Sequence, residues 1–320
     1  MNQMIPSFVF KRRAWMAIKP WMQVLVVIGL LVVLPGLANQ VVVLLTKAAP
    51  EGYILEPAQD LLTYASQPLP AEMTPEQEAE ILQGAEEHMT AFMGATERFL
   101  SEKGGVYFGM MAVEMILTPV FLAPLYGSLL DALRKKELTL AGALGHLRQG
   151  PKMLLLQIWT ALRVFVWMLP GTVVMFVGAF VPAVGTLLTW VGFIAGMVMG
   201  VRAALHYILA PVVLMDKPEA SLNGCIRESW QIMRTRKMEY FMLQISFVGW
   251  RLLLGLLEML AVNPVTYVIV LTLTMTGSML LTLYINGAVT AFWDAYGVRR
   301  EKASAASFDP QAFMGGDDLN

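Results

Sequence analysis

The stretch FMLQISFVGWRLLLGLLEML, residues 241–260, has the length and apolar content of a helix that crosses a lipid bilayer. About 20 mostly apolar residues are needed to span the hydrocarbon core. This stretch nevertheless carries Arg251 near its centre and Glu258 two turns later. An arginine at the centre of a membrane helix costs about 2.5–3.5 kcal/mol even on lenient insertion scales. The stretch therefore predicts a membrane span whose charges need partners.

Apolar runs of similar length recur through the chain, which is 57% hydrophobic and 15% charged over 320 residues. Its mean hydropathy is +0.59. The composition predicts an all-α fold, a polytopic membrane helix bundle of about six transmembrane helices. The predicted spans are 22–46, 106–130, 153–180, 184–215, 240–262 and 265–296.

Basic residues are distributed unevenly over the connecting segments, and this predicts the orientation of the chain. Of the 23 Lys and Arg residues, 17 lie on the N-terminal tail, on 131–152, on 216–239 and on the tail after the last span. Cytoplasmic loops carry the excess of Lys and Arg. Both termini are therefore predicted to be cytoplasmic, and segment 47–105, with 11 acidic residues, is predicted to lie outside.

Four segments follow from this pattern. Residues 1–46 form a cytoplasmic tail and the first span, and 47–105 form an acidic external loop. Residues 106–302 form the membrane bundle with its basic interfacial elements. The small and polar tail 303–320 is predicted to be disordered.

The external loop contains one strong helix signal. Its first half carries four prolines and is predicted to be irregular. The sequence TPEQ then offers Thr74 as the N-cap of a helix that Gly104 can end. This helix either covers the outer surface of the bundle, docks a protein partner or acts as a lid. The predicted partner contacts are Met89, Phe92 and Phe99.

The cytoplasmic segment 218–237 also has a helical pattern, with apolar residues beside a basic face. It is predicted either to lie on an anionic leaflet or to form an elbow between two spans. Arg234, Arg236 and Lys237 are the candidate contacts to lipid headgroups. Because the basic residues flank membrane spans and form no separate domain, no nucleic-acid partner is expected.

Gly192, Gly196 and Gly200 recur every four residues in GFIAGMVMG (192–200) and therefore share one helix face. Small residues at this spacing let two helix backbones approach closely. The sequence leaves open whether the contact is internal or between subunits.

Three ionisable residues fall near the middle of predicted spans: Glu114, Arg163 and Arg251. Glu258 lies about 10.5 Å along the helix from Arg251, too far for an easy direct bond. A buried Glu114–Arg163–Arg251 cluster, structural or part of a solute pathway, would offset the insertion cost of each member. Alternatively, Arg163 marks the cytoplasmic start of a shorter third span and extends to the interface.

Residues that carry chemistry are sparse. The three histidines lack metal-ligand spacing, and no nucleophile elbow, phosphate loop or dinucleotide fingerprint is present. No cofactor, metal or catalytic residue is expected, and the protein is predicted not to be an enzyme.

Several stretches resemble a bacterial integral-membrane family, domain of unknown function 975. They are VRAALHYILA (201–210), FMLQISFVGW (241–250), TAFWDAY (290–296), RRAWMAIKPWM (12–22) and VWMLPG (166–171). A looser similarity runs to the membrane domain of some glycerophosphodiester phosphodiesterases. Arg251 stands where the family usually has an aliphatic residue. The resemblance implies a multi-pass protein of the bacterial cytoplasmic (inner) membrane and implies no reaction.

Together these features predict a non-enzymatic membrane protein that binds or organises a protein or lipid partner. The alternative is a transporter or channel for a small solute, with Glu114, Arg163 and Arg251 along the path. No internal inverted repeat supports transport.

Overall fold

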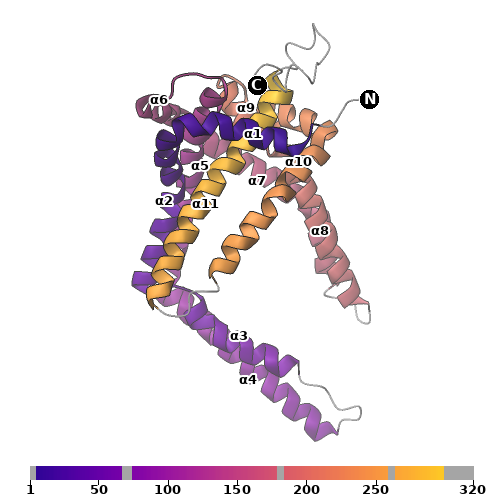
Figure 1. Cartoon of the computed structure of the whole chain (residues 1–320). Helices are drawn as coiled ribbons and strands as arrows, with labels where there is room; N and C mark the ends of the chain where they lie inside the picture. Colours follow the sequence, from indigo (N-terminus) through magenta and orange to yellow (C-terminus); the bar gives the residue numbers. More distant parts are fainter. Residues whose placement is uncertain (1–4, 67–73, 179–183, 259–263, 299–320) are drawn as a thin grey trace. The chain divides into compact units, whose positions relative to one another are not determined.

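The structure is a computed structural model that describes residues 5–66, 74–178, 184–258 and 264–298. These residues form helices joined by short turns (Figure 1). The α-helices are α1 (Ser7–Ile18), α2 (Met22–Thr46), α3 (Glu51–Ala65), α4 (Pro75–Phe99), α5 (Gly105–Leu133), α6 (Leu140–Gly145), α7 (Gly150–Gly178), α8 (Gly185–Tyr207), α9 (Ala210–Asp216), α10 (Leu222–Glu258) and α11 (Pro264–Trp293). The predicted tail 303–320 lies outside the described residues.

Six helical segments of the described residues are long and apolar enough to cross a membrane. They are Ser7–Thr46, Pro75–Leu133, Leu140–Gly178, Gly185–Asp216, Leu222–Leu257 and Thr272–Gly297. Each contains or overlaps one predicted span, so the prediction of a six-span all-α bundle is confirmed. The protein is a multi-pass helical membrane protein.

The chain divides into two compact units, and α2 and α5 contribute to both. The first unit comprises residues 1–32 and 119–320, and the second comprises residues 33–118. The second unit contains the predicted external loop together with the adjoining parts of α2 and α5.

In the first unit, α1 lies across the end of the long helices (Figure 1). Its apolar face is buried because Phe10 packs on Phe292, with ring centroids 5.1 Å apart, while Ala14 and Ile18 meet Gly287 of α11. Trp293, at the end of α11, is fully buried. The beginning of α1 and the end of α11 therefore lie at the same end of this unit, as an even number of spans requires.

The α7–α8 pair is a hairpin held by glycines. A Cβ atom at Gly171 would lie 2.3 Å from the Cα of Gly196, and one at Gly192 would lie 2.3 Å from the backbone N of Met175. Gly200 meets the side chain of Met168. The predicted glycine face, Gly192, Gly196 and Gly200, thus packs within the chain against α7, and the backbones approach as closely as they do because these positions lack side chains.

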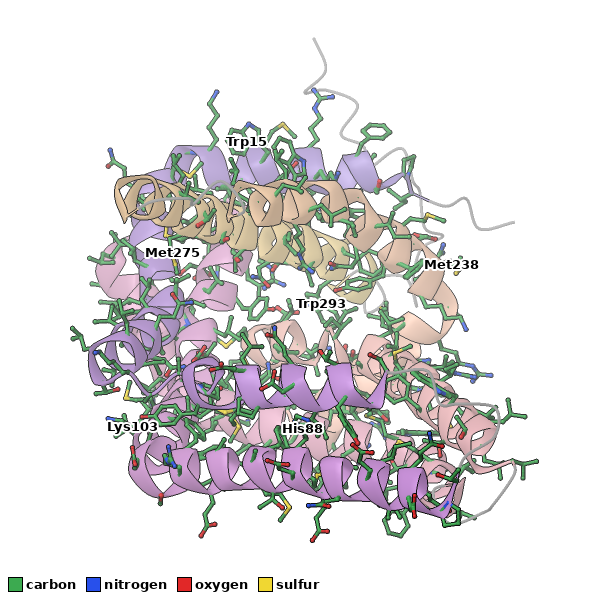
Figure 2. The ribbon with its side chains drawn as sticks, turned by 90° about the horizontal axis from the view of Figure 1, so that it is seen from below. Trp15, His88, Lys103, Met238, Met275 and Trp293 are labelled. Carbon is green, nitrogen blue, oxygen red and sulfur yellow. The ribbon has the colours of Figure 1, made fainter. Side chains whose placement is uncertain are left out.

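In the second unit, α3 and α4 form a hairpin. The prediction that the loop before Thr74 is irregular is wrong, because Glu51–Ala65 is helical despite Pro57. Pro57 has no backbone N–H to donate within the helix, and packing against α4 compensates for this loss. Tyr64 donates to the carbonyl of Ile81 (2.8 Å), and its ring lies 4.8 Å from that of His88. Figure 2 shows His88 between the two helices.

Helix α4 begins as predicted, with a capping box in which Thr74 and Gln77 exchange hydrogen bonds. Its predicted end at Gly104 is wrong. The chain passes through a π-helical turn (Leu100–Gly104) directly into α5, and Gly105 keeps a right-handed φ of −60°. Without a left-handed residue there is no C-cap, so the helix continues.

Segment 218–237 is helical from Leu222 onward, but it is not a separate helix. It becomes the first part of α10, which runs without a break from Leu222 to Glu258. Its position on an anionic leaflet stays a prediction. Its apolar residues Ile226 and Met233 are buried, and Trp230 is 39% exposed. The amphipathic pattern thus reflects packing on one side of a long helix.

Candidate functional site

Five basic side chains surround one end of the α7–α8 hairpin, where α10 begins. We call them the basic collar: Arg163, Arg202, Arg227, Arg234 and Lys237. Arg163 is half-buried, and the other four are exposed. They come from three helices, so the fold, and not a run of sequence, brings them together.

A pocket of 480 Å³ lies between α7, α8 and α10 and contains two collar arginines, Arg163 and Arg227. The side-chain oxygen of Asn223 accepts hydrogen bonds from Arg163 Nη2 (3.0 Å) and from Trp159 Nε1 (2.8 Å). The Arg163 guanidinium also lies 5.5 Å from the centre of the Trp159 ring. These contacts hold the half-buried Arg163 in place and leave further N–H donors available, because a guanidinium has five.

A second pocket, of 330 Å³, lies between α8 and α10 and contains Arg202, His206 and Lys237 beside apolar residues of α8. Trp230 connects the two pockets. It lines the first pocket, its ring lies 6.3 Å from that of His206, and the Arg234 guanidinium lies 5.4 Å from its centre. The two pockets therefore belong to one basic and aromatic surface.

The collar has no acidic partner among the described residues: no carboxylate oxygen lies within 4.0 Å of a collar nitrogen. Five cations without carboxylates are left to water or to a bound anion. Basic pockets between spanning helices are suited to anionic lipid headgroups.

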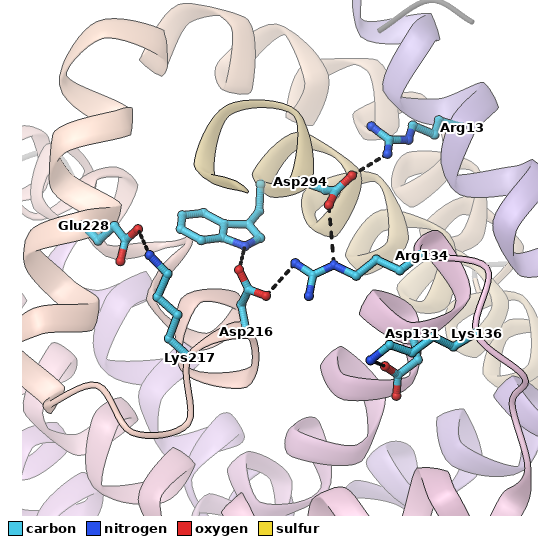
Figure 3. Close-up of polar contacts among 9 residues, drawn as sticks. Arg13, Asp131, Arg134, Lys136, Asp216, Lys217, Glu228 and Asp294 are labelled. Atoms are coloured by element: carbon cyan, nitrogen blue, oxygen red, sulfur yellow. Dashed lines mark hydrogen bonds and ion pairs between the residues drawn. The ribbon is translucent and has the colours of Figure 1, made fainter. Parts of the chain in front are cut away.

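In a second cluster of charges, the basic side chains do have acidic partners (Figure 3). We call it the clasp: Arg13, Arg134, Asp216, Asp294 and Trp293. Arg134 contacts Asp216 (2.5 Å) and Asp294 (3.7 Å), and Asp294 also pairs with Arg13.

The indole of Trp293 donates to the second oxygen of Asp216 at 3.2 Å. The clasp thus joins α1, the end of α5, α9 and the end of α11. Its carboxylates are largely buried, with 8% of the Asp216 side chain and 12% of the Asp294 side chain exposed. Every charge is used within the chain, so the clasp is a structural device.

Arg236 differs from the other two predicted headgroup contacts, Arg234 and Lys237. Its guanidinium pairs with Glu239 (2.6 Å) and lies 4.9 Å from the Tyr296 ring centre. Only 14% of its side chain is exposed. Arg236 is therefore occupied within the chain and is not part of the collar.

The structure does not bring Arg163 and Arg251 together. Arg163 lines a pocket with Tyr207 and Asn223, level with the last turn of α8, so it lies at one end of the hairpin and not halfway along it. That Arg163 marks the cytoplasmic start of a shorter third span stays a prediction, since α7 itself begins at Gly150. Arg251 lines a different cleft between α10 and α11.

Glu114 belongs to the second unit, where Asn39 of α2 donates to it at 2.7 Å. A Cβ atom at Gly36 would lie 3.2 Å from the Glu114 carboxylate, so this glycine provides the space for it. Because Arg163 and Arg251 lie apart, only a contact of Glu114 with one of the two arginines stays a hypothesis. The side chain of Glu258 lies outside the described residues.

The predicted partner contacts on α4 have different environments. Phe99 is 3% exposed, because Tyr53 and Tyr107 pack on its ring at 5.7 Å each. Phe92 is half-buried. Met89 is 46% exposed and is the one of the three that presents most of its surface.

No sequence pattern predicted the clasp. Arg13 and Arg134 served only to predict orientation, and the two aspartates received no role. A signal was present, since Asp216 and Asp294 are single acidic residues placed where apolar runs end in basic segments. Acidic residues in such positions are candidates for ion pairs within the bundle.

No protein-family model, curated protein or solved structure matches this chain. The resemblance to domain of unknown function 975 therefore stays a prediction that depends on the quoted residues.

Proposed function

We propose that this protein is a non-enzymatic membrane protein that binds anionic phospholipids, with their headgroups in the basic collar. The observation that carries the proposal is the set of five collar cations that have no carboxylate within 4.0 Å among the described residues. By the distribution of basic residues, the collar faces the cytoplasmic leaflet.

The chemistry of the pocket around Arg163 supports a phosphate ligand. Arginine presents a planar fork of donors that matches phosphate oxygens. Arg163 is already oriented by Asn223 and Trp159, so less conformational entropy is lost when a headgroup binds. Arg227 shares the pocket and adds a second cation.

The surroundings of the collar support a lipid as the source of that phosphate. Beyond Arg163, α7 presents Phe165, Val166 and Trp167, which are 57%, 55% and 52% exposed. Exposed apolar side chains of this kind on a membrane span face acyl chains. A molecule with an anionic head and apolar tails can therefore contact the collar and the helix surface at once.

The test is native mass spectrometry of the protein in a neutral detergent, titrated with phosphatidylglycerol, cardiolipin and phosphatidylcholine. Anionic lipids should be retained more tightly than phosphatidylcholine. The double variant Arg163→Gln/Arg227→Gln should lose about 2 kcal/mol of headgroup affinity, at about 1 kcal/mol for each cation. That loss corresponds to roughly thirtyfold in the dissociation constant.

A matched control is available in Arg12→Gln/Arg148→Gln. This variant removes the same charge from two exposed positions on the predicted cytoplasmic face but outside the collar. It should bind anionic lipid like the unaltered protein. Equal losses in the two double variants, or equal affinity for anionic and zwitterionic lipid, would contradict the proposal.

A further inference from the structure

A separate cleft of 570 Å³ opens between α10 and α11, with Tyr126 of α5 at its inner wall. The cleft follows α10 from Tyr240 to Gly255, a rise of about 22 Å at 1.5 Å per residue. Its volume falls in the range of small-molecule sites.

The cleft has an open end and a buried end. Arg251, Gly255 and Ser278 at one end are exposed, whereas Tyr126, Tyr240 and Val289 at the other are buried. A ligand would therefore enter at the Arg251 end and extend inward. The collar lies elsewhere, and its pockets share no lining residue with this cleft.

The polar groups at the buried end already have partners. Tyr126 donates to the side-chain oxygen of Asn286 (2.8 Å), and the Asn286 amide donates to the Thr282 carbonyl (2.8 Å). Gln244 donates to the Tyr240 hydroxyl (2.6 Å). A ligand that fills this end therefore need not supply hydrogen bonds there and can be apolar, as Ile285 and Val289 beside them are.

Arg251 at the open end is different. Among the described residues no carboxylate oxygen lies within 4.0 Å of its guanidinium. Its neighbours on α10 are lipid-facing leucines, since Leu252 is 63% exposed and Leu253 is 50% exposed. A cation among apolar side chains in a spanning helix is costly and typically marks a functional site. An anion at the mouth of the cleft would offset that cost.

We propose that the cleft binds a single-chain amphiphile with an acidic head, such as a fatty acid or a lysophosphatidate. The acidic head contacts Arg251 and Ser278 at the open end. The acyl chain follows α10 inward past Leu254 and Leu281 toward Ile285. Carboxylate and phosphate heads share the anionic chemistry that Arg251 requires, and a single acyl chain can follow the length of the cleft.

Gly255 offers a direct steric test of this site. It lines the open end, and a Cβ atom there would have no atom within 4 Å. A leucine at this position can therefore fill the mouth of the cleft without disturbing the packing of α10. Gly249 is the matched control, because it lies on the same helix, also has no atom within 4 Å of a Cβ, and does not line the cleft.

The experiment is native mass spectrometry of the full chain in a neutral detergent, titrated with oleate, 1-oleoyl lysophosphatidate and methyl oleate. One oleate or one lysophosphatidate should bind per chain, and methyl oleate should not. Whichever acid binds more tightly identifies the head as carboxylate or phosphate. Both Arg251→Gln and Gly255→Leu should weaken binding at least tenfold, and Gly249→Leu should leave it unchanged.

Binding of methyl oleate as tight as that of oleate would overturn the proposal, as would unchanged binding in Arg251→Gln and Gly255→Leu. Thermal unfolding of each variant in the same detergent separates a lost site from a lost fold. The test is also independent of the proposed function, because Arg251→Gln should bind phosphatidylglycerol like the unaltered protein. Loss of phosphatidylglycerol binding in the collar variant says nothing about this cleft.

Discussion

The clasp and the basic collar both contain arginines, but these arginines have different neighbours. In the clasp, Arg13 and Arg134 face two largely buried aspartates. In the collar, Arg163 faces an asparagine and a tryptophan, and no carboxylate lies within reach among the described residues. Arginine side chains therefore hold the bundle together in the clasp and are available to a ligand in the collar.

The comparison gives a criterion for interpreting basic residues in membrane proteins. A count of basic residues near membrane spans predicts orientation. It does not distinguish arginines that stabilise the bundle from arginines that are available to a ligand. The distinction depends on whether the fold brings a carboxylate to each cation. Variants that remove a carboxylate or a cation should consequently affect different properties in the two regions.

The largest effect is expected from Asp216→Ala in the clasp. This variant leaves the partly exposed Arg134 without its closest carboxylate and the buried indole N–H of Trp293 without its acceptor. One charged and one neutral hydrogen bond are lost, which together cost about 3 kcal/mol. Thermal unfolding in detergent, followed by tryptophan fluorescence, should show a clear decrease in the midpoint. Retention of phosphatidylglycerol per folded molecule should not change. An unaltered midpoint would show that the clasp contributes little to stability.

The next largest effect is expected from Gly192→Val, which acts on the support of the collar. The added side chain meets the backbone of Met175 and should cost roughly 1–3 kcal/mol of packing energy. Because α7 and α8 would separate, Arg163 would move away from the rest of the collar.

Both the unfolding midpoint and anionic-lipid retention should therefore decrease in Gly192→Val. Gly109→Val is the control, since a Cβ atom at Gly109 has no atom within 4 Å. Full lipid retention in Gly192→Val would mean that the collar does not depend on the hairpin.

Salt should separate the two regions without any substitution. At 1 M ionic strength the Debye length is about 3 Å, so exposed charges are strongly screened while largely buried pairs are screened less. Retention of phosphatidylglycerol should therefore decrease as NaCl rises from 0.1 to 1 M, roughly tenfold or more. The midpoint of thermal unfolding should change little over the same series. Parallel decreases in both would contradict the distinction.

The smallest effect is expected from the conservative changes Arg163→Lys and Arg134→Lys. A lysine keeps the charge in the collar, so lipid retention should fall by less than about 1 kcal/mol, or roughly fivefold. In the clasp, Arg134 uses Nη2 and Nε toward two different aspartates, which a single ammonium group does not reproduce. Arg134→Lys should thus lower the unfolding midpoint, and Arg163→Lys should not.

The sequence predicted the elements that depend on local patterns. Long apolar runs located the spans, and the capping box located the start of α4 at Thr74. The helix at Glu51–Ala65 was missed because Pro57 locally disfavours a helix interior. The contact of Tyr64 with α4, which supports this helix, is a tertiary contact that local patterns do not show. The end predicted at Gly104 failed because a glycine permits a left-handed cap but does not require one.

The charged groups were harder to predict. Depth along a helix placed Arg163 and Arg251 at the same level, but depth does not show which faces of two helices meet. The structure puts Arg163 beside Asn223 and puts Arg251 in another cleft. The partners of both clasp aspartates are also distant in sequence, and Arg13 and Asp294 are 281 positions apart. Only the packing of the whole unit brings such residues together.

The glycine contact between α7 and α8 has a consequence for how the protein is made. The two helices are neighbours in the sequence, and the contact between Gly171 and Gly196 is formed by backbone atoms of these two helices alone. The hairpin can therefore pack as soon as both helices have left the ribosome and entered the membrane, before α10 and α11 exist. It would then provide α10 with a preassembled surface against which to dock during synthesis.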